Sequence, residues 1–179
     1  KDGEGQWRLM TGNQIGCELL HYILSTKKKQ GRLEANAAAC KSIVSTSLAN
    51  RICESFGVKM FEVLTGFKFI GEQIGLLEKD GREKDYIFGF EESYGYLAGG
   101  YVRDKDAVVA SMLICEMAAF YRAQGVSLIE ARKRMYAEYG SYCNKLDNFA
   151  FEGESGMAKM QEIMDSIRKD WGLVYPKEK

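Results

Sequence analysis

The chain has 179 residues, 46% of them hydrophobic, which is enough to bury the core of one compact domain with appended segments. Lysine and arginine total 25 and aspartate and glutamate also total 25, so no overall charge favours nucleic acid or an anionic membrane as a partner. No apolar run approaches the roughly 20 residues of a membrane span, and the N-terminus has no apolar signal segment, which predicts a cytoplasmic protein.

The cysteine and histidine content argues against a disulfide framework and against a zinc site. The five cysteines are odd in number, widely spaced and free of any C-x-x-C pair, which favours reduced and mostly buried thiols. His21 is the single histidine, so a multi-histidine metal site is excluded and a structural or surface role is favoured over a catalytic one. The cysteines are Cys17, Cys40, Cys53, Cys115 and Cys143.

A polar segment and an amphipathic helix open the chain. Residues 1–10 have few apolar anchors and are expected to be a linker or the end of a preceding domain. After Thr11, a suitable N-cap, apolar residues recur every four positions over residues 15–23, which predicts one buried helical face. This helix should end in the basic run of residues 27–29, because cations are favourable at a helix C-terminus.

Three predicted strands then alternate with helices. The expected elements are a strand over residues 40–46, a helix ending at Gly57, a strand over 58–64, a helix over about 69–79 and a strand over 86–90. Hydroxyls at residues 45–47 can cap the first of these helices. The alternation indicates right-handed βαβ units, and hence a layered α/β/α domain with a small mixed sheet between helices.

Ligands of such sheets bind beyond the carboxyl ends of the strands. Three loops are expected there: residues 45–47, 65–68 and 91–105. The helix that follows, from Asp106 to about Arg122, is apolar on nearly every side, so we expect it to be buried in the core.

The end of the chain changes character. Ser127 can cap a last domain helix, so that residues 11–140 form the predicted domain. Residues 144–151 are predicted to be a strand or linker, and 157–167 a short amphipathic helix with no obvious packing partner. We therefore expect residues 141–179 to be a linker and the incomplete start of another domain.

Adjacent carboxylates at the end of the third strand are candidate ligands for a polyol. Glu91 and Glu92 point to opposite sides of an extended backbone, so they cannot act as a glycosidase-like pair. One carboxylate with Ser93 can bind sugar hydroxyls while the other bonds backbone amides of the loop; a solvated acidic turn explains the residue types equally well. The nearby glycines favour close approach of a ligand.

Cations converge on the same edge of the sheet. Arg103 and Lys105 precede a helix, where positive charge opposes the macrodipole unless an anion is bound, although Asp104 and Asp106 can neutralise them instead. Lys68 lies at another loop-to-helix junction of this edge. Their convergence favours a phosphorylated ligand.

Four motifs in order resemble the third domain of the α-D-phosphohexomutases, the phosphoglucomutase and phosphomannomutase family. They are TGNQIG from Thr11, TGFKFIG from Thr65, GFEESYGYLAG from Gly89 and YVRDKDAVVASML from Tyr101. The resemblance covers roughly residues 10–140. It implies a four-domain enzyme that moves a phosphoryl group between C1 and C6 of a hexose through a bisphosphorylated intermediate, with magnesium and a hexose bisphosphate activator.

The resemblance also implies roles for individual residues. Glu91 with Ser93 is the pair most similar to the family's sugar-hydroxyl ligands, and Glu92 is the weaker candidate. Gly66 and Lys68 match the loop that meets the sugar in its alternative orientation. Lys105 matches the suggested general acid/base, with Arg103 as an anion-facing neighbour; both roles suit phosphoryl transfer, which depends on positioning and charge neutralisation.

The family's phosphorylated serine, its D-x-D-x-D magnesium loop and its phosphate-clamping loop have no counterpart in this sequence. We therefore expect a domain without mutase activity or bound cofactor on its own, whose partners are a hexose phosphate and the other domains of the same polypeptide. The alternatives to a phosphoglucomutase domain are a phosphomannomutase or phosphopentomutase domain, or a stand-alone sugar-phosphate-binding module.

Overall fold

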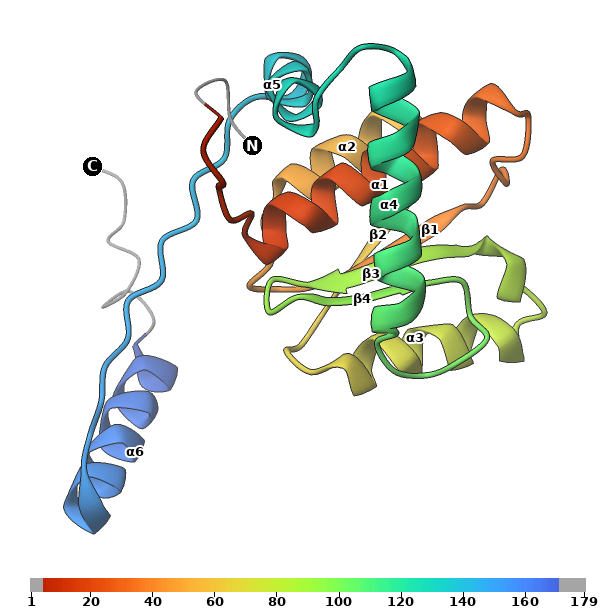
Figure 1. The fold of residues 1–179 in the computed structure, drawn as a ribbon. Helices are drawn as coiled ribbons and strands as arrows, with labels where there is room; N and C mark the ends of the chain where they lie inside the picture. Colours follow the sequence, from red (N-terminus) through yellow and green to blue (C-terminus); the bar gives the residue numbers. More distant parts are fainter. Residues whose placement is uncertain (1–4, 171–179) are drawn as a thin grey trace, which may run out of the picture. The chain divides into compact units, whose positions relative to one another are not determined.

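The computed structural model describes residues 5–170, and the chain divides into two compact units between Cys143 and Asn144. The first unit contains a four-stranded sheet with helices on both faces, and the second contains one helix (Figure 1). The elements are α1 (Gly12–Lys29), β1 (Ala38–Ser42), α2 (Leu48–Phe56), β2 (Lys59–Val63), α3 (Phe67–Lys79), η1 (Glu83–Asp85), β3 (Tyr86–Glu91), β4 (Gly95–Ala98), α4 (Ala107–Ala123), α5 (Leu128–Tyr139) and α6 (Gly153–Lys169).

The sheet has the order β2-β1-β3-β4. β1 pairs in parallel with both β2 and β3, whereas β4 runs antiparallel to β3. The predicted layered α/β/α fold with a mixed sheet is therefore confirmed. The sequence did not reveal β4: the predicted loop over residues 91–105 contains a strand, in which Tyr96 and Leu97 are buried.

Two apolar clusters fill the space on the two faces of the sheet. One joins α1, α2, α4 and α5 to the side of β3 that carries Phe88 and Phe90. The other joins α3, through Ile70 and Ile74, to the side that carries Tyr86. Tyr86 and Phe88 lie in different clusters, although they are two residues apart, because the register of β3 against β1 shifts between them.

The helix boundaries follow their caps. Thr11 Oγ1 accepts the Gln14 amide while the Gln14 side chain accepts the Thr11 amide, so a complete capping box begins α1 at the predicted residue. Gly57, with φ of 70°, ends α2 in the left-handed conformation that favours glycine.

Two sequence predictions are wrong. The first strand ends at Ser42 and not at residue 46: the Ser45 amide bonds the Ser42 carbonyl in a turn, which leaves Ile43 and Val44 about half exposed. α4 is not enclosed by the core either, because Val108 is 71% and Met112 66% exposed. One face of α4 packs on β4 and α1, and its apolar residues extend beyond that face.

A buried carboxyl connects α1 to α5. Glu18 is 4% exposed, and its oxygens have no hydrogen-bond partner among residues 5–170; the Arg132 guanidinium is 3.6 Å away. Burial raises the pKa of Glu18 from 4.5 to about 7, although Arg132 acts in the opposite direction. At a pH between 4.5 and about 7, the Glu18 carboxyl is therefore mostly protonated in the folded chain and mostly ionised in the unfolded chain. The stabilisation that comes from this difference is lost as the pH rises through about 7.

Glu18→Gln is expected to remove this dependence. Relative to the wild type, the variant should gain up to about 3 kcal/mol of unfolding free energy between about pH 5 and about pH 8. Urea denaturation of both chains at each pH measures the difference, and the lowered pKa of the buried His21 cancels in the comparison because both chains contain it. Glu34→Gln, at an exposed position, is the control; an equal Glu18→Gln effect at both pH values would contradict the assignment.

The second unit, described on its own, has no regular structure before α6. Helix α6 contains the predicted helix over residues 157–167 and begins four residues earlier. An apolar cavity of about 400 Å³ lies between α6 and the segment before it. Among residues 5–170, no helix combines the length and apolar character needed to cross a lipid bilayer.

Candidate sugar-phosphate site

Glu91 joins the end of β3 to the loop before α3. Its side chain is 6% exposed, and its Oε1 accepts the Gly66 amide at 2.6 Å. Gly66 has φ of 121° and ψ of 125°, a conformation that side chains rarely adopt, so glycine is required where this loop turns into the helix. The structure therefore brings together two of the predicted ligand positions, Glu91 and Gly66.

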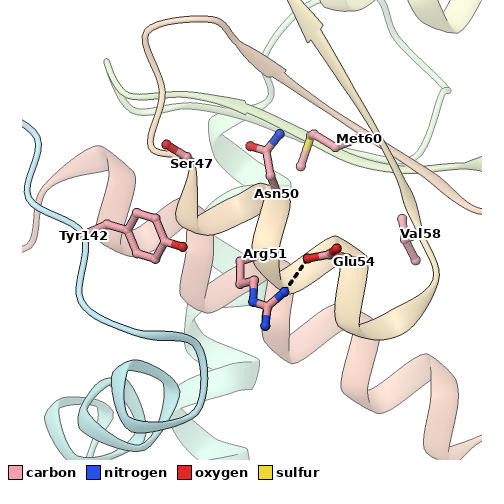
Figure 2. Close-up of a pocket in the computed structure, with 7 residues that line it drawn as sticks. All are labelled: Ser47, Asn50, Arg51, Glu54, Val58, Met60 and Tyr142. Carbon is pink, nitrogen blue, oxygen red and sulfur yellow. Dashed lines mark hydrogen bonds and ion pairs between the residues drawn. The ribbon is translucent and has the colours of Figure 1, made fainter. Parts of the chain in front are cut away.

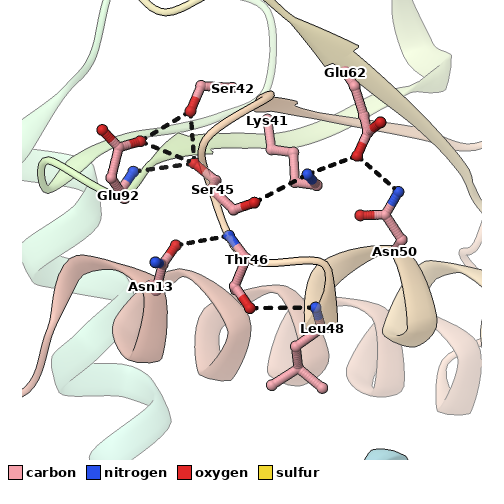
Figure 3. A network of polar contacts seen from close by, with 9 residues as sticks. All are labelled: Asn13, Lys41, Ser42, Ser45, Thr46, Leu48, Asn50, Glu62 and Glu92. Atoms are coloured by element: carbon pink, nitrogen blue, oxygen red, sulfur yellow. Dashed lines mark hydrogen bonds and ion pairs between the residues drawn. The ribbon is translucent and has the colours of Figure 1, made fainter. Parts of the chain in front are cut away.

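Glu92 is held by serine hydroxyls of the neighbouring loop (Figure 3). Its Oε2 accepts Ser42 Oγ at 2.9 Å and Ser45 Oγ at 3.1 Å, and its amide donates to Ser45 Oγ at 3.1 Å. The two hydroxyls are also 2.8 Å apart. Each hydroxyl has one proton, so two protons serve three contacts: the two bonds to the carboxylate and the one between the hydroxyls.

Ser93 is exposed in the turn between β3 and β4. The next residue, Tyr94, has φ of 67° and is the one non-glycine residue with positive φ among residues 5–170. The Tyr94 hydroxyl donates to the Met10 carbonyl at 3.1 Å, which fixes the turn against the segment that leads into α1. Ser93 is thereby presented to solvent next to two anchored carboxylates.

The glycines of the TGNQIG motif allow α1 to approach this turn closely. A Cβ added to Gly12 would lie 1.9 Å from the Glu92 carbonyl oxygen, and one added to Gly16 would lie 2.4 Å from the Phe90 ring. Asn13 also bonds the Thr46 amide at 3.0 Å (Figure 3). The start of α1 thus supports both loops of the site.

Lys105 extends toward the Glu91 and Gly66 corner. Its Cδ would lie 3.4 Å from a Cβ at Gly95, the residue that pairs with Glu91 across the ladder, and its Nζ is 5.9 Å from the centre of the Phe67 ring. The Nζ also pairs with exposed Asp104 at 3.1 Å. An exposed pair of this kind is weak and exchanges readily for another anion.

Lys68 lies in the first turn of α3, at the same corner. Its Nζ is 4.9 Å from the centre of the Phe69 ring, and the residue is exposed. Lys105 thus brings positive charge near Phe67 and the Glu91 and Gly66 contact, whereas Lys68 is placed only by its sequence position, two residues after Gly66 at the start of α3.

Arg103 is directed elsewhere. Its guanidinium pairs with Glu78 near the end of α3 and bonds the carbonyls of Gly100 and Val102. Its carbonyl also lies against α3, where a Cβ at Gly71 would be 2.6 Å away. The structure therefore separates Arg103 from the corner that contains Lys105.

Asp106 occupies the start of α4. Its Oδ1 accepts the Val108 amide at 2.8 Å and the Val109 amide at 3.0 Å, so these free amides are satisfied within the chain. The Tyr101 hydroxyl donates to its other oxygen, and this bond, followed by the Val109 amide, lowers the pKa of Asp106. Of the charges before α4, Asp104 thus pairs with Lys105, whereas Asp106 caps the helix and contacts neither cation.

Sequence reasoning missed Lys41, which lies in β1 with a side chain only 2% exposed. Its Nζ is 2.7 Å from Glu62 Oε1 and donates to the Ser45 carbonyl at 3.2 Å. Asn50 Nδ2 donates to the same Glu62 oxygen at 3.0 Å (Figure 3). The available signal in the sequence was a lysine within a predicted strand. Its partner, Glu62, lies on another strand, and sequence spacing did not indicate that pairing.

A surface pocket of about 480 Å³ lies beside α2 (Figure 2). Its cation and anion, Arg51 and Glu54, pair with each other at 2.6 Å. None of the predicted ligand residues lines it: the lining residues are Ser47, Asn50, Arg51, Glu54, Val58, Met60 and Tyr142. Within residues 5–170, no three histidine, cysteine, aspartate or glutamate side chains gather as metal ligands, so the described side chains do not fit a magnesium site.

Comparison with known proteins supports the resemblance. A family model described as phosphoglucomutase/phosphomannomutase, alpha/beta/alpha domain III, matches residues 11–139. A phosphoglucomutase of Staphylococcus epidermidis (ATCC 12228) is 38% identical over 170 residues, or 95% of this chain and 30% of that protein. A phosphoglucomutase of Staphylococcus aureus (N315) is 37% identical over 171 residues, with the same coverages of 95% and 30%. The chain thus spans about 30% of the length of these relatives.

Two solved structures share the fold. A Thermus thermophilus protein named as a phosphomannomutase has a TM-score of 0.57 and 26% identity, over 80% of this chain and 30% of that one. The open form of Paramecium parafusin, a phosphoglucomutase, has a TM-score of 0.62 over 94% of this chain and 28% of that one. Its identity of 18% supports similarity of fold alone.

Proposed function

Because the chain belongs to the phosphoglucomutase/phosphomannomutase family as its α/β/α domain III, we propose that it is the sugar-binding domain of a phosphohexomutase. The full-length enzyme would transfer a phosphoryl group between C1 and C6 of a hexose phosphate. The observation that carries the proposal is the corner where the Glu91 carboxylate accepts the Gly66 amide and toward which Lys105 extends, with the exposed Ser93 two residues after Glu91. It offers hydroxyl-binding groups and positive charge together, as a sugar phosphate requires.

Each residue has a distinct role in this proposal. Glu91 and Ser93 bind sugar hydroxyls, with Glu91 oriented by the Gly66 amide. Lys68, with Gly66, meets the sugar in its alternative orientation. Lys105 is the general acid/base at the transferring phosphoryl group, where it exchanges Asp104 for the substrate.

The two remaining candidates receive smaller roles. Glu92 serves the site through its loop contacts, since Ser42 and Ser45 occupy one of its oxygens. Arg103, as an anion-facing neighbour, has to leave Glu78 before it can reach a phosphoryl group, so its contribution is smaller than that of Lys105.

Other parts of a longer polypeptide complete the proposed enzyme. They would supply the phosphorylated serine, the magnesium ligands and the phosphate-clamping loop, with residues 1–10 leading from a preceding domain and 141–179 beginning the next. We place the enzyme in the cytoplasm, where the five free cysteines remain reduced. Glucose phosphate is the proposed substrate because the staphylococcal relatives are phosphoglucomutases, and this chain alone should show no turnover.

Ser93→Ala and Glu91→Gln in the full-length enzyme test the proposed sugar contacts. Loss of a hydrogen bond to a neutral hydroxyl or to a charged group costs about 0.5–3 kcal/mol, so kcat/KM for glucose 1-phosphate should fall by a factor between about 2 and about 150. Ser111→Ala, on exposed α4, is the matched control. Wild-type kinetics in both site variants would refute the assignment of this corner to the sugar.

A further inference from the structure

Lys41 is buried at the centre of the sheet. In the sheet, Lys41 lies opposite Glu62 of β2 on one side and opposite Phe90 of β3 on the other. Phe90 directly precedes Glu91 in the sequence. Removing an ammonium group from water is costly, and apolar replacements of buried ion pairs are often neutral or stabilising. Stability alone therefore does not explain a lysine here, and the groups that its ammonium contacts become informative.

The contacts of Lys41 lead directly to the proposed sugar loop. Its Nζ binds the Ser45 carbonyl, and the Ser45 hydroxyl accepts the Glu92 amide and contacts the Glu92 carboxylate. Figure 3 shows these contacts, and Ser45, at their centre, is only 4% exposed. Lys41 thus fixes the backbone of the residue whose hydroxyl fixes Glu92.

The ammonium group is itself held from the other side. Glu62 Oε1 is 2.7 Å from it and also accepts Asn50 Nδ2, which orients the carboxylate from α2. The bonds from Lys41 and Asn50 lower the pKa of Glu62, so this carboxylate remains charged. The contacts run without a break from β2 to the turn between β3 and β4.

We propose that Lys41 is a positioning residue for substrate: through Ser45 and Glu92 it sets the position of the loop that presents Glu91 and Ser93 to the sugar. The inference rests on the proposed function of that loop. It extends the site from the residues that contact the sugar to a buried cation on a neighbouring strand. Removal of the cation should weaken sugar binding more than it changes the chemical step.

Lys41→Met in the full-length enzyme tests the inference, because methionine retains much of the volume and loses the charge. We expect KM for glucose 1-phosphate to rise about tenfold with kcat within about twofold, which is the signature of lost uniform binding. Lys59→Met, an exposed lysine on the adjacent strand, should leave both constants unchanged.

A double-mutant cycle with Glu92→Gln distinguishes positioning from a general structural role. If Lys41 acts through Glu92, the double variant should raise KM by about tenfold, as each single variant does, and not by about a hundredfold. Additive effects, or an unchanged KM in Lys41→Met, would overturn the inference. Should Lys41→Met fail to fold, Glu62→Gln decides in the same cycle, since its partly exposed side chain tolerates the exchange.

Glu91→Gln and Ser93→Ala in the same assay separate the two levels of the argument. If these variants raise KM while Lys41→Met does not, the positioning role is wrong and the proposed sugar loop stands. If neither of them raises KM, the sugar loop itself is refuted, and the role of Lys41 with it.

Discussion

Lys105→Met in the full-length enzyme is expected to lower kcat for phosphoryl transfer by about a hundredfold or more, the usual range for loss of a general acid or base. The Lys105 side chain crosses Gly95 toward Phe67, next to the Glu91 and Gly66 contact. Its one ion pair within residues 5–170 is with exposed Asp104, so substrate phosphate can replace that partner at little cost. Steady-state kinetics with glucose 1-phosphate measure the loss.

The fold should not change in this variant, because the Lys105 side chain is 58% exposed. Thermal denaturation of Lys105→Met and wild type is therefore expected to coincide. Lys79→Met is the matched control, because Lys79 is at the C-terminal end of α3, whereas Lys105 approaches Phe67 at its N-terminal end. This variant should keep the wild-type kcat. A kcat for Lys105→Met within twofold of wild type would exclude Lys105 from the chemical step.

Gly12→Ala is expected to have the largest effect on stability. A Cβ at this position would lie 1.9 Å from the Glu92 carbonyl oxygen and 2.9 Å from the Tyr94 amide nitrogen, both backbone atoms. Relief requires α1 to move away from the turn, and overpacking of this kind costs about 1–3 kcal/mol or more. Urea denaturation of the chain should show the loss.

Gly75→Ala is the matched control for Gly12→Ala. Gly75 is in α3, where an added Cβ meets nothing within 4 Å, so alanine should raise the unfolding free energy by about 0.5–1 kcal/mol. Opposite signs for the two glycines are the expected result. A neutral Gly12→Ala would show that α1 and the turn adjust to each other without cost.

The sequence allowed most of the fold to be predicted where local signals decide it. Thr11 and Gly57 set helix ends through their own chemistry, and the alternation of strands and helices was enough to predict the layered α/β/α architecture. Ile43 and Val44 misled because β-branched residues favour strands, whereas here the chain turns to bring two serines to Glu92. This turn depends on a contact with a residue that is distant in the sequence, and local strand propensity does not reflect such contacts.

The prediction for α4 failed for a related reason. A helix that is apolar on nearly every side is typical of a buried helix, but Val108 and Met112 are exposed in the described part of the chain. The composition of a helix shows that its surface is apolar, but it does not show which residues contact that surface. The antiparallel strand β4 was hidden by its glycines, which are also typical of turns.

The sequence motifs grouped the candidate site residues into a prediction but did not indicate the directions of their side chains. The motifs brought Glu91, Gly66, Lys68 and Lys105 into one hypothesis, and within it the structure shows the Glu91–Gly66 bond and the approach of Lys105 to that contact. The direction of Arg103 toward Glu78 could not be read from spacing, because a flexible side chain pairs with whichever carboxylate the fold brings near it. The roles of all these residues in catalysis and binding remain predictions for the experiments above.

The strand order has a consequence for how the protein folds. β1 pairs with β3, although α2, β2 and α3 lie between these strands in the sequence. A long stretch of chain must therefore close into a loop before the contacts of this central ladder can form. Pairings of this kind slow folding, since the entropy of the closed segment is lost before the contacts compensate. The loops that hold Glu91 and Glu92 meet only once this ladder exists. Ligand affinity should therefore appear among the last events of refolding, after most helical structure has already formed.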